Sequence, residues 1–401
     1  RDGTLWFGGF MLYGLRDGSW QTWSSREAPI PFHRIRLLEA DDGALWIAGL
    51  GEHAVRLDLG ASRTQTHRDL HFQCETAEGD RWFVELPTGE ETSGIAIVRR
   101  MAATGAWIRY DTDDGLPDEP NCVATTSDGR IWASGGHDGE AATARFDGTV
   151  WHRQIHPGLA FRLAPNAVTE TADGHLWYSS DNIWDGDRGH GGGLLQIDPS
   201  RQGPDNWTVH VPWANTHSYS MGSTADGRLW TGADRLRAYD GSTWRVFPEP
   251  RGLNNWIHGT VGTPAGDLWV ATRTYGVFHL VDHVWHNYTV KDGLPTNTVQ
   301  DVLPTGDGTV WAATTEGVAR FDGHGWIVYP ALDRAVGWAG GLREGLDGTV
   351  WVNEHHTLSQ TTAYRPDRDP PQTEITLSLA EVGTSGNTVV NWAGVDRWRD
   401  S

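Results

Sequence analysis

One repeated motif, a glycine followed three residues later by a tryptophan, runs through this chain of 401 residues. Nine copies of the motif recur at a regular spacing, and an aspartate precedes the glycine in seven of these nine. Its tryptophans are Trp6, Trp46, Trp82, Trp132, Trp177, Trp230, Trp269, Trp311 and Trp351. They recur about every 43 residues, and a period of roughly 40 to 45 residues built from short strands is typical of a β-propeller blade. The repeat therefore predicts one all-β ring instead of two or three ordinary domains.

The unit at residues 292–329 shows the predicted anatomy of a blade most clearly. Its alternating apolar stretches predict four strands, at residues 299–303, 310–314, 317–321 and 326–329. Asp-Gly pairs separate strands one and two and strands three and four, and both pairs are signals for tight hairpin turns. In a four-stranded meander these two turns share one face, which we call the turn face. The other connections emerge on the opposite face, where the repeats differ in sequence, and we call this the variable face.

Most of the 23 tryptophans are predicted to be structural. The tryptophan of each motif is interpreted as a wedge between adjacent blades, because a ring of sheets packed face to face needs one bulky residue per interface. A second tryptophan follows the second turn in seven units, at Trp20, Trp107, Trp151, Trp207, Trp244, Trp285 and Trp326. The large number of tryptophans is therefore no evidence for a tryptophan-rich ligand site.

Counting repeats predicts the number of blades. The first repeat shows strands two to four and the last, residues 337–363, shows strands one to three, so closure is expected to pair material from both ends. Nine second strands predict a nine-bladed propeller over residues 1–364, and eight blades with an edge remnant is the alternative. A polar, proline-rich linker at 365–372 follows, and residues 373–401 are predicted to be the truncated start of a β-sandwich. Because the chain begins within a repeat unit, any signal sequence is expected upstream.

Composition narrows the range of partners. The chain has 32 Lys and Arg against 52 Asp and Glu, a formal net charge of −20, which argues against nucleic-acid ligands and against an anionic membrane surface. No apolar run approaches the roughly 18 residues of a transmembrane helix. Cys74 and Cys122 fall on corresponding strands of neighbouring repeats and are interpreted as plain buried thiols.

The string DGLPTNTVQDV, followed by DGTVWAATTEGVARFDG, resembles the propeller repeat of the extracellular sensor regions of bacterial two-component regulators. Related fragments stand at residues 114–117, 128–132 and 145–148, and the resemblance covers roughly residues 1–365. It implies an extracellular or periplasmic ligand-sensing domain, often for oligosaccharides, that precedes an immunoglobulin-like domain. By this resemblance, residues 373–401 are a fragment of that immunoglobulin-like domain. It also implies a downstream signalling module, which this chain does not contain.

A second resemblance points to catalysis. Strings of the form DG-x-Leu-Trp-Phe also occur in the lyase propellers that open streptogramin-type lactones, which use a histidine with acidic and metal-binding partners. Of the 18 histidines, those predicted to reach the variable face are His53, His137, His190, His217, His258, His355 and His356.

The candidate ligand site is assigned to the variable face, because functional residues concentrate on loops held by a rigid scaffold. The longest interval between motif tryptophans, Trp177 to Trp230, contains an insertion at 180–190 between strands two and three. An aromatic ring beside Asp, Asn and Arg is what a sugar needs for stacking and for hydrogen bonds to its hydroxyls. The predicted ligand-binding residues are Trp184, Asp185, Arg188, His190, Trp213, His217, Trp256, His258, Arg273, Tyr275 and Trp338. The alternative for these tryptophans is that they plug the central channel or cover blade edges.

No catalytic or cofactor motif supports an enzyme. The sequence has no Gly-x-Ser-x-Gly elbow, P-loop or Cys-x-x-Cys, and no cofactor is predicted. Calcium at Asp181, Asp185 and Asp187 is the one metal hypothesis, but their spacing matches no standard loop and a solvated acidic loop is preferred.

The sequence thus favours a monomeric, non-catalytic sensor propeller that binds a small molecule or oligosaccharide. A lyase or hydrolase acting on a polysaccharide or lactone is one alternative, and a protein-interaction scaffold is the other.

Overall fold

The computed structural model describes residues 64–365, except 88–93, 160, 186–187, 202–205, 214–215, 249, 322, 330–340 and 355–359. Outside this range it describes the strand residues 5–8, 12–16, 19–23, 36–39, 45–48, 54–57, 372–377 and 391–395. No helix in the described part is long and apolar enough to cross a membrane.

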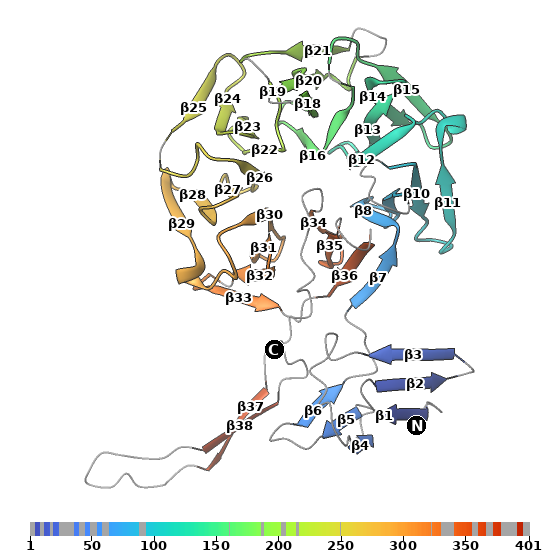
Figure 1. Cartoon of the computed structure of the whole chain (residues 1–401), viewed down its shortest axis with the longest axis vertical. Coiled ribbons are helices and arrows are strands. Elements are labelled where there is room, and N and C mark those ends of the chain that lie inside the picture. Colours follow the sequence, from blue (N-terminus) through green and yellow to red (C-terminus); the bar gives the residue numbers. More distant parts are fainter. Residues whose placement is uncertain are drawn as a thin grey trace.

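Seven four-stranded antiparallel sheets stand around a central axis as the blades of a propeller (Figure 1). We number the blades by their innermost strands, which are β8 (Leu70–Glu75), β12 (Glu119–Thr125), β16 (Leu163–Glu170), β22 (Ser220–Ser223), β26 (Ile257–Gly262), β30 (Val299–Pro304) and β34 (Leu342–Glu344). The second strands are β9 (Arg81–Glu85), β13 (Ile131–His137), β17 (Leu176–Ser180), β23 (Leu229–Gly232), β27 (Leu268–Thr272), β31 (Val310–Thr314) and β35 (Val350–Glu354).

The outer half of each blade completes the meander. The third strands are β10 (Ala96–Arg100), β14 (Glu140–Phe146), β20 (Leu194–Ile197), β24 (Leu236–Tyr239), β28 (Val277–Val281), β32 (Gly317–Phe321) and β36 (Gln360–Tyr364). The outermost strands are β11 (Trp107–Tyr110), β15 (Trp151–Ile155), β21 (Trp207–His210), β25 (Trp244–Phe247), β29 (Val284–Tyr288), β33 (Trp326–Tyr329) and β7 (Thr64–Arg68). The unit read from the sequence is confirmed, since β31, β32 and β33 have the predicted bounds and β30 ends one residue later.

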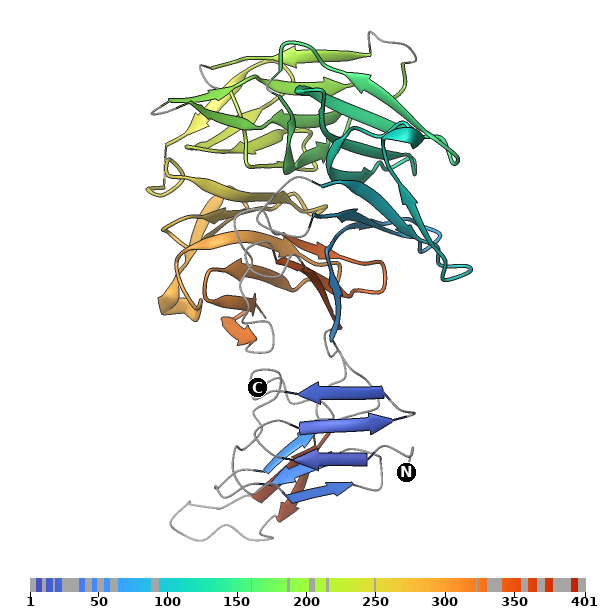
Figure 2. The same ribbon diagram turned by 45° about the vertical axis from the view of Figure 1, so that its right-hand side comes forward.

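The prediction of nine or eight blades is wrong, because the ring has seven. Repeats one and two form two three-stranded sheets that lie outside the ring (Figure 1, Figure 2). Their strands are β1 (Leu5–Gly8), β2 (Leu12–Arg16), β3 (Ser19–Trp23), β4 (Arg36–Glu39), β5 (Leu45–Ala48) and β6 (Ala54–Leu57). Each of the nine motif tryptophans does lie on a strand, but the hydrogen-bonding edge of β36 is taken by β7, the fourth strand of repeat two. The ring closes at this pairing, so the three-stranded sheets of the first two repeats are not inserted between blades.

The tryptophan wedges are confirmed for the seven repeats of the ring. Their tryptophans are at most 4 % exposed, and each packs between its own blade and the next. Trp311, for example, shares one core with Val318 of its own blade and with Leu342 of blade seven. Blade seven in turn packs on blade one, where the ring of Trp351 stacks on Phe72 with centroids 4.3 Å apart.

The Asp-Gly-Leu-Pro motif has a structural role in both of its copies. Each begins at the end of a short 3-10 helix, η1 (Thr112–Asp114) and η2 (Val290–Asp292). Gly115 follows η1 with φ of 93°, where a Cβ would meet the Trp151 carbonyl oxygen at 2.0 Å. The next residue, Leu116, is fully buried between blades one and two. The motif therefore joins consecutive blades instead of forming a ligand contact.

A side chain hydrogen-bonds to the backbone of the next blade at each of the seven interfaces. In the order of the blades, the side chains involved are Gln73, Asn121, Ser179, Ser220, His258, Asp301 and Asn353. Their partners are Val123 N, Leu163 O, Ser218 N, Thr260 N, Val299 O, Leu342 N and Phe72 O. Five of these side chains belong to innermost strands and two, Ser179 and Asn353, to second strands, and together the bonds join each blade to the next.

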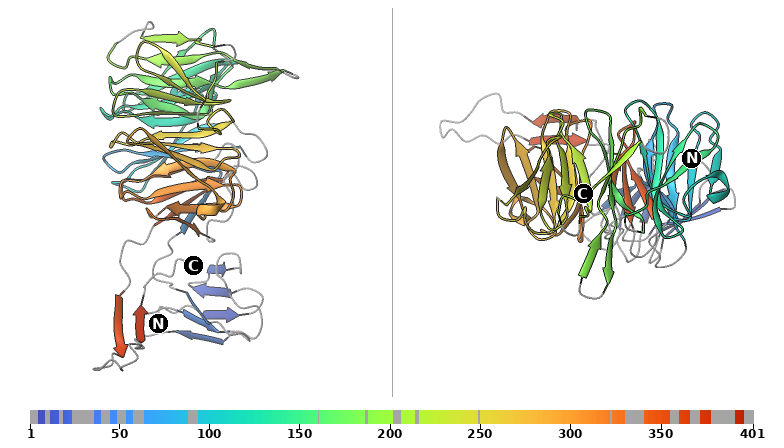
Figure 3. Two further views of the ribbon diagram at one scale, coloured as in Figure 1. Left: turned by 90° about the vertical axis from the view of Figure 1, so that its left-hand side faces the viewer. Right: turned by 90° about the horizontal axis from the view of Figure 1, so that it is seen from above.

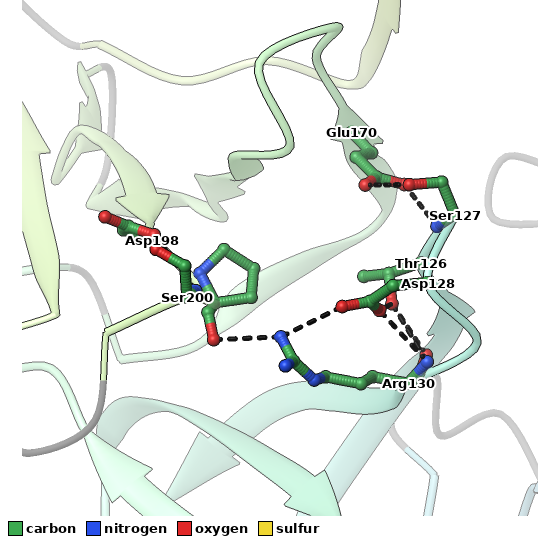
Figure 4. Close-up of polar contacts among 8 residues, drawn as sticks. Thr126, Ser127, Asp128, Arg130, Glu170, Asp198 and Ser200 are labelled. Carbon is green, nitrogen blue, oxygen red and sulfur yellow. Dashed lines mark hydrogen bonds and ion pairs between the residues drawn. The ribbon is translucent and has the colours of Figure 1, made fainter.

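A second set of contacts joins the blades on the turn face, and Figure 4 shows one of them. The backbone N–H and the hydroxyl of Ser127, in the turn of blade two, both donate to the Glu170 carboxylate of blade three at 2.7 Å. The Arg130 guanidinium spans the same interface and donates to the Pro199 carbonyl at 2.9 Å. Glu344 and Glu75 receive the equivalent backbone donors at the next-to-last and closing interfaces. The turn face is therefore occupied by contacts between blades.

The segments after the ring form a two-stranded antiparallel pair, β37 (Gln372–Leu377) and β38 (Asn391–Val395). This pair also lies outside the ring in Figure 2. Its assignment to an immunoglobulin-like domain stays a prediction.

Candidate ligand site at the channel mouth

A cavity of about 610 Å³ occupies the central channel. Residues of the innermost strands of all seven blades line it, so the ring closure itself creates the cavity. Its volume falls within the roughly 300 to 1,000 Å³ of small-molecule sites. The thiols of Cys74 and Cys122 lie on this wall, and burial raises the pKa of the Cys74 thiol.

An aromatic cluster of five residues stands at the variable-face end of the channel, and two of them, Tyr219 and His258, line the cavity. Tyr219 and Trp256 immediately precede the innermost strands of blades four and five, and their rings stack with centroids 5.8 Å apart and an interplanar angle of 21°. His217 meets the edge of the Tyr219 ring at 5.3 Å, and His258 meets it at 6.5 Å. The Arg273 guanidinium lies over the Trp256 ring, 5.7 Å from its centroid. We call these five residues the aromatic cluster.

Trp256 adopts an unusual backbone conformation, with φ of 42°. A bulky side chain is rarely found in this left-handed region, where strain of roughly 1–3 kcal/mol is usual and functional sites are over-represented. Two hydrogen bonds enforce the conformation here. Arg273 N donates to the Trp256 carbonyl at 3.0 Å, and Ile257 N donates to the Ala233 carbonyl at 2.7 Å. The fold therefore holds this indole at the channel mouth against its local preference.

His258 connects the aromatic cluster to the ring of bonds between blades. Its Nδ1 donates to the Val299 carbonyl of blade six at 3.1 Å, and its ring also lines the cavity. Burial and the nearby Arg273 guanidinium lower the pKa of His258, while the bond to Val299 acts in the opposite direction. The imidazole is therefore neutral at pH 7.

Ionic pairs continue the wall of the cavity in the other blades. Arg162, just before the innermost strand of blade three, donates from Nε to Asp181 Oδ2 at 2.7 Å and lies 3.6 Å from the Glu119 carboxylate. Deeper in the channel, Arg343 lies 3.8 Å from Asp301. Burial raises the pKa of Asp301, although Arg343 and the Leu342 and Val302 N–H donors act against the increase.

The insertion predicted between strands two and three of blade three is a hairpin, β18 (Asn182–Asp185) with β19 (Arg188–Gly191). Figure 3 shows it projecting from the ring. Its base is fixed by Ser180, whose backbone N–H donates to the Gly193 carbonyl at 3.0 Å and whose hydroxyl accepts from Gly192 N at 2.9 Å. The hairpin therefore rises between Asp181 of the ionic wall and Thr216, the neighbour of His217 in the aromatic cluster.

The predicted site residues are distributed unevenly around this mouth. His217, Trp256, His258 and Arg273 come together in the aromatic cluster. The predicted residues on the hairpin are Trp184, Asp185, Arg188 and His190, and the backbone register pairs Trp184 with Gly189 and Asp185 with Arg188. Their side chains, like the whole of Trp338, lie outside the described part of the chain.

Trp213 and Tyr275 lie apart from the cavity. The Trp213 ring packs edge to face on Trp244 at 5.1 Å and carries the Arg237 guanidinium 4.2 Å from its centroid. Tyr275 packs on the core between blades four and five. Trp213 therefore agrees with the alternative prediction, in which the variable-face tryptophans cover blade edges instead of binding a ligand.

The sequence did not single out Tyr219 or Arg162. Both stand at the variable-face end of an innermost strand, as Trp256 does. Their position just before the first strand of a repeat could therefore have identified them as candidates. Asp181 was considered only as a calcium ligand, and its carboxylate is paired with Arg162. Asp187 and the side chain of Asp185 lie outside the described residues.

Histidine–carboxylate pairs occur away from the cavity. His137 lies 3.5 Å from Asp118 and 3.6 Å from Asp138 on the variable face. On the turn face the pairs are His152–Asp147, His175–Asp173 and His279–Asp267. Among the described residues, no three His, Cys, Asp or Glu side chains are grouped to hold a metal ion.

No protein-family profile matches the sequence, and no curated protein matches it. Solved structures do match the fold. The extracellular domain of the hybrid two-component system BT3049 from B. thetaiotaomicron has a TM-score of 0.63 at 15 % identity, and the match covers 98 % of this chain and 55 % of that one. Virginiamycin B lyase from Staphylococcus aureus has a TM-score of 0.56 at 12 % identity, covering 75 % of this chain and 98 % of the lyase.

PorZ, a surface component of the type IX secretion system of Porphyromonas gingivalis, has a TM-score of 0.51 at 12 % identity, covering 90 % of this chain and 56 % of PorZ. The chain therefore spans little more than half of the extracellular domain of BT3049 and of PorZ. At such identities the likeness concerns the fold alone. The chain shares the β-propeller fold with extracellular sensor domains and with a lyase.

Proposed function

We propose that this chain is a non-catalytic, extracellular ligand-sensing propeller that binds a small molecule or oligosaccharide at the mouth of its central channel. The observation that carries the proposal is Trp256, whose ring is held by a strained backbone in a stack with Tyr219 beside the cavity. Aromatic rings beside directional hydrogen-bonding groups are what a ring-shaped, hydroxylated ligand requires. The fold shared with the extracellular domain of BT3049 supports the assignment as a sensor.

The test replaces Trp256 by glycine, because glycine accepts a φ of 42° without strain. We expect Trp256→Gly to keep the melting temperature within a few degrees of the wild type, or to raise it, while ligand affinity falls at least tenfold. Ligands are first found by thermal shift against an oligosaccharide panel, since a ligand of the folded state raises the melting temperature. Affinities are then measured by isothermal titration calorimetry.

Trp107→Ala is the matched control, because this indole is 46 % exposed and lies on the outer strand of blade one. It should leave affinity unchanged. If Trp256→Gly binds as tightly as the wild type, the aromatic cluster is not the site. If no member of the panel shifts the melting temperature of the wild type, the assignment as an oligosaccharide sensor fails.

The lyase alternative has one structural observation in its favour, namely that His137 lies near two carboxylates on the variable face. None of these three side chains lines the cavity. A bound ligand that is recovered cleaved, with the cleavage lost in His137→Ala, would establish the enzyme, whereas intact recovery supports the sensor.

A further inference from the structure

We propose that the channel mouth selects uncharged, hydroxyl-rich ring ligands and discriminates against both acidic and amine-bearing sugars. This inference rests on the proposed function and names the ligand class of the same site. It comes from the balance of charge around the cavity.

The charged side chains that line the cavity compensate one another. Apart from His258, Tyr219 and the two thiols, the described ionisable residues of the lining are two arginines and two aspartates. They form two ion pairs, Arg162 with Asp181 at 2.7 Å and Arg343 with Asp301 at 3.8 Å. The side chains of Arg162 and Asp181 are each only 21 % exposed. The channel therefore presents charged groups without a net formal charge.

The charges at the rim of the cavity are balanced in the same way. Arg273 adds one positive charge, but its guanidinium lies on the indole of Trp256. Glu119 adds one negative charge, and its carboxylate faces Arg162. His258 contributes no charge at pH 7, because burial and Arg273 lower its pKa. A ligand bound here meets balanced dipoles beside an aromatic platform.

A hydroxyl group suits such a surface better than a charged group does. It both donates and accepts a hydrogen bond, so vicinal hydroxyls can bridge the guanidinium and the carboxylate of one pair. A ligand carboxylate or ammonium would place an uncompensated charge in a largely buried site, which is unfavourable unless a partner is supplied. The formal charge of −20 on the whole chain opposes polyanions further. The apolar face of a sugar ring, in contrast, stacks on an aromatic ring without any charge.

The experiment measures binding of three sugar classes of matched length by calorimetry at 50 and 300 mM NaCl. The neutral probes are xylo-, cello-, manno- and malto-oligosaccharides, the acidic probes are oligogalacturonides, and the amine-bearing probes are chitosan oligosaccharides. We expect at least one neutral probe to bind, with an affinity that changes less than twofold between the two salt concentrations. Acidic and amine-bearing probes should bind at least tenfold more weakly.

Two substitutions should change the selectivity in opposite directions. Asp181→Asn removes the nearer of the two carboxylates beside Arg162, leaving Glu119 at 3.6 Å, and should improve binding of oligogalacturonides relative to neutral probes at least fivefold. Arg162→Met leaves the carboxylate and should favour chitosan oligosaccharides in the same way. Asp226→Asn and Arg228→Met are the matched controls, because they alter an ion pair of 2.8 Å on the turn face and should change no preference.

Each outcome separates this inference from the function on which it rests. If the wild type prefers acidic or amine-bearing probes, the charge argument is overturned while the sensor assignment stands. If no probe of any class binds, the proposed function as an oligosaccharide sensor itself fails. Should Asp181→Asn not fold, as judged by thermal unfolding, the salt dependence and class preference of the wild type still decide the matter.

Discussion

At the scale of single residues, His156 shows how the core makes stability depend on pH. The imidazole is fully buried, bonds through Nε2 to the Thr143 hydroxyl at 2.8 Å and meets the Trp207 ring edge to face at 5.0 Å. Burial lowers the pKa of His156 to about 4, below its usual 6.5. Between these two values the unfolded chain binds a proton that the folded chain rejects.

The stability contribution of neutral His156 is therefore complete above pH 6.5 and is lost as the pH falls from 6.5 to about 4. A shift of this size corresponds to about 3 kcal/mol. Denaturant unfolding at pH 7 and pH 4 should show that His156→Gln loses about 3 kcal/mol less stability on acidification than the wild type. His283→Gln, a change at an exposed histidine in the turn between β28 and β29, is the control and should behave like the wild type. Equal losses in the wild type and in His156→Gln would contradict the assignment.

Residue patterns foretold the packing roles better than the ligand site. The motif tryptophans could be assigned as wedges because an identical position in every repeat must do the same work in every blade. Trp256 and Tyr219 do not recur at an equivalent position in every repeat. Each lies in a connection between blades that differs in length and composition from the other connections. Their stacking depends on how blades four and five are placed side by side, and it is visible only once the ring is formed.

At the scale of elements, the closing interface depends on one buried side chain. Asn353 of β35 accepts from Phe72 N at 3.1 Å, donates to the Phe72 carbonyl at 2.9 Å, and also accepts from the Thr361 hydroxyl at 2.6 Å. It joins segments 281 residues apart in the chain. The other interfaces connect consecutive blades, which the chain itself keeps close together.

Asn353→Ala should lower the free energy of unfolding by about 2–4 kcal/mol, because it leaves the Phe72 backbone groups buried without partners. Urea unfolding measures the loss. Asn287→Ala, which removes exposed and partly buried bonds to the Tyr275 and Val277 carbonyls within blade five, should cost less than about 1 kcal/mol. A loss in Asn353→Ala no larger than that of Asn287→Ala would show that the closing bonds are not needed.

At the scale of the whole molecule, the number of blades could not be read from the number of repeats. The period and the turns describe one blade at a time, and they are equally clear in β1–β6 and in the ring. Ring membership is decided by which strand occupies the edge of β36, a pairing between residues about 300 positions apart. Local sequence patterns carry no information about a pairing between such distant segments. The chain therefore has nine repeats, as counted, but only seven of them form blades of the ring.

The strand β7 should therefore be the boundary of the folded ring. It pairs with β36 over five residues, and the His67 ring lies 5.9 Å from that of Trp351 and 5.7 Å from that of Phe83. A chain that begins at Ser62 keeps this strand and should retain a cooperative unfolding transition and the ligand affinity of the full chain. A chain that begins at Leu70 lacks it and exposes both the edge of β36 and the aromatic packing, so it should melt at least 10 °C lower or fail to fold.

A peptide of residues 62–69 added in trans should restore the transition of the shorter chain, because an extended segment can complete an open sheet edge. A scrambled peptide of the same composition is the control. If the chains beginning at Ser62 and at Leu70 unfold at the same temperature, β7 does not close the ring. If the chain beginning at Ser62 is itself unfolded, the ring depends on the first two repeats, and the seven blades are not a folding unit of their own.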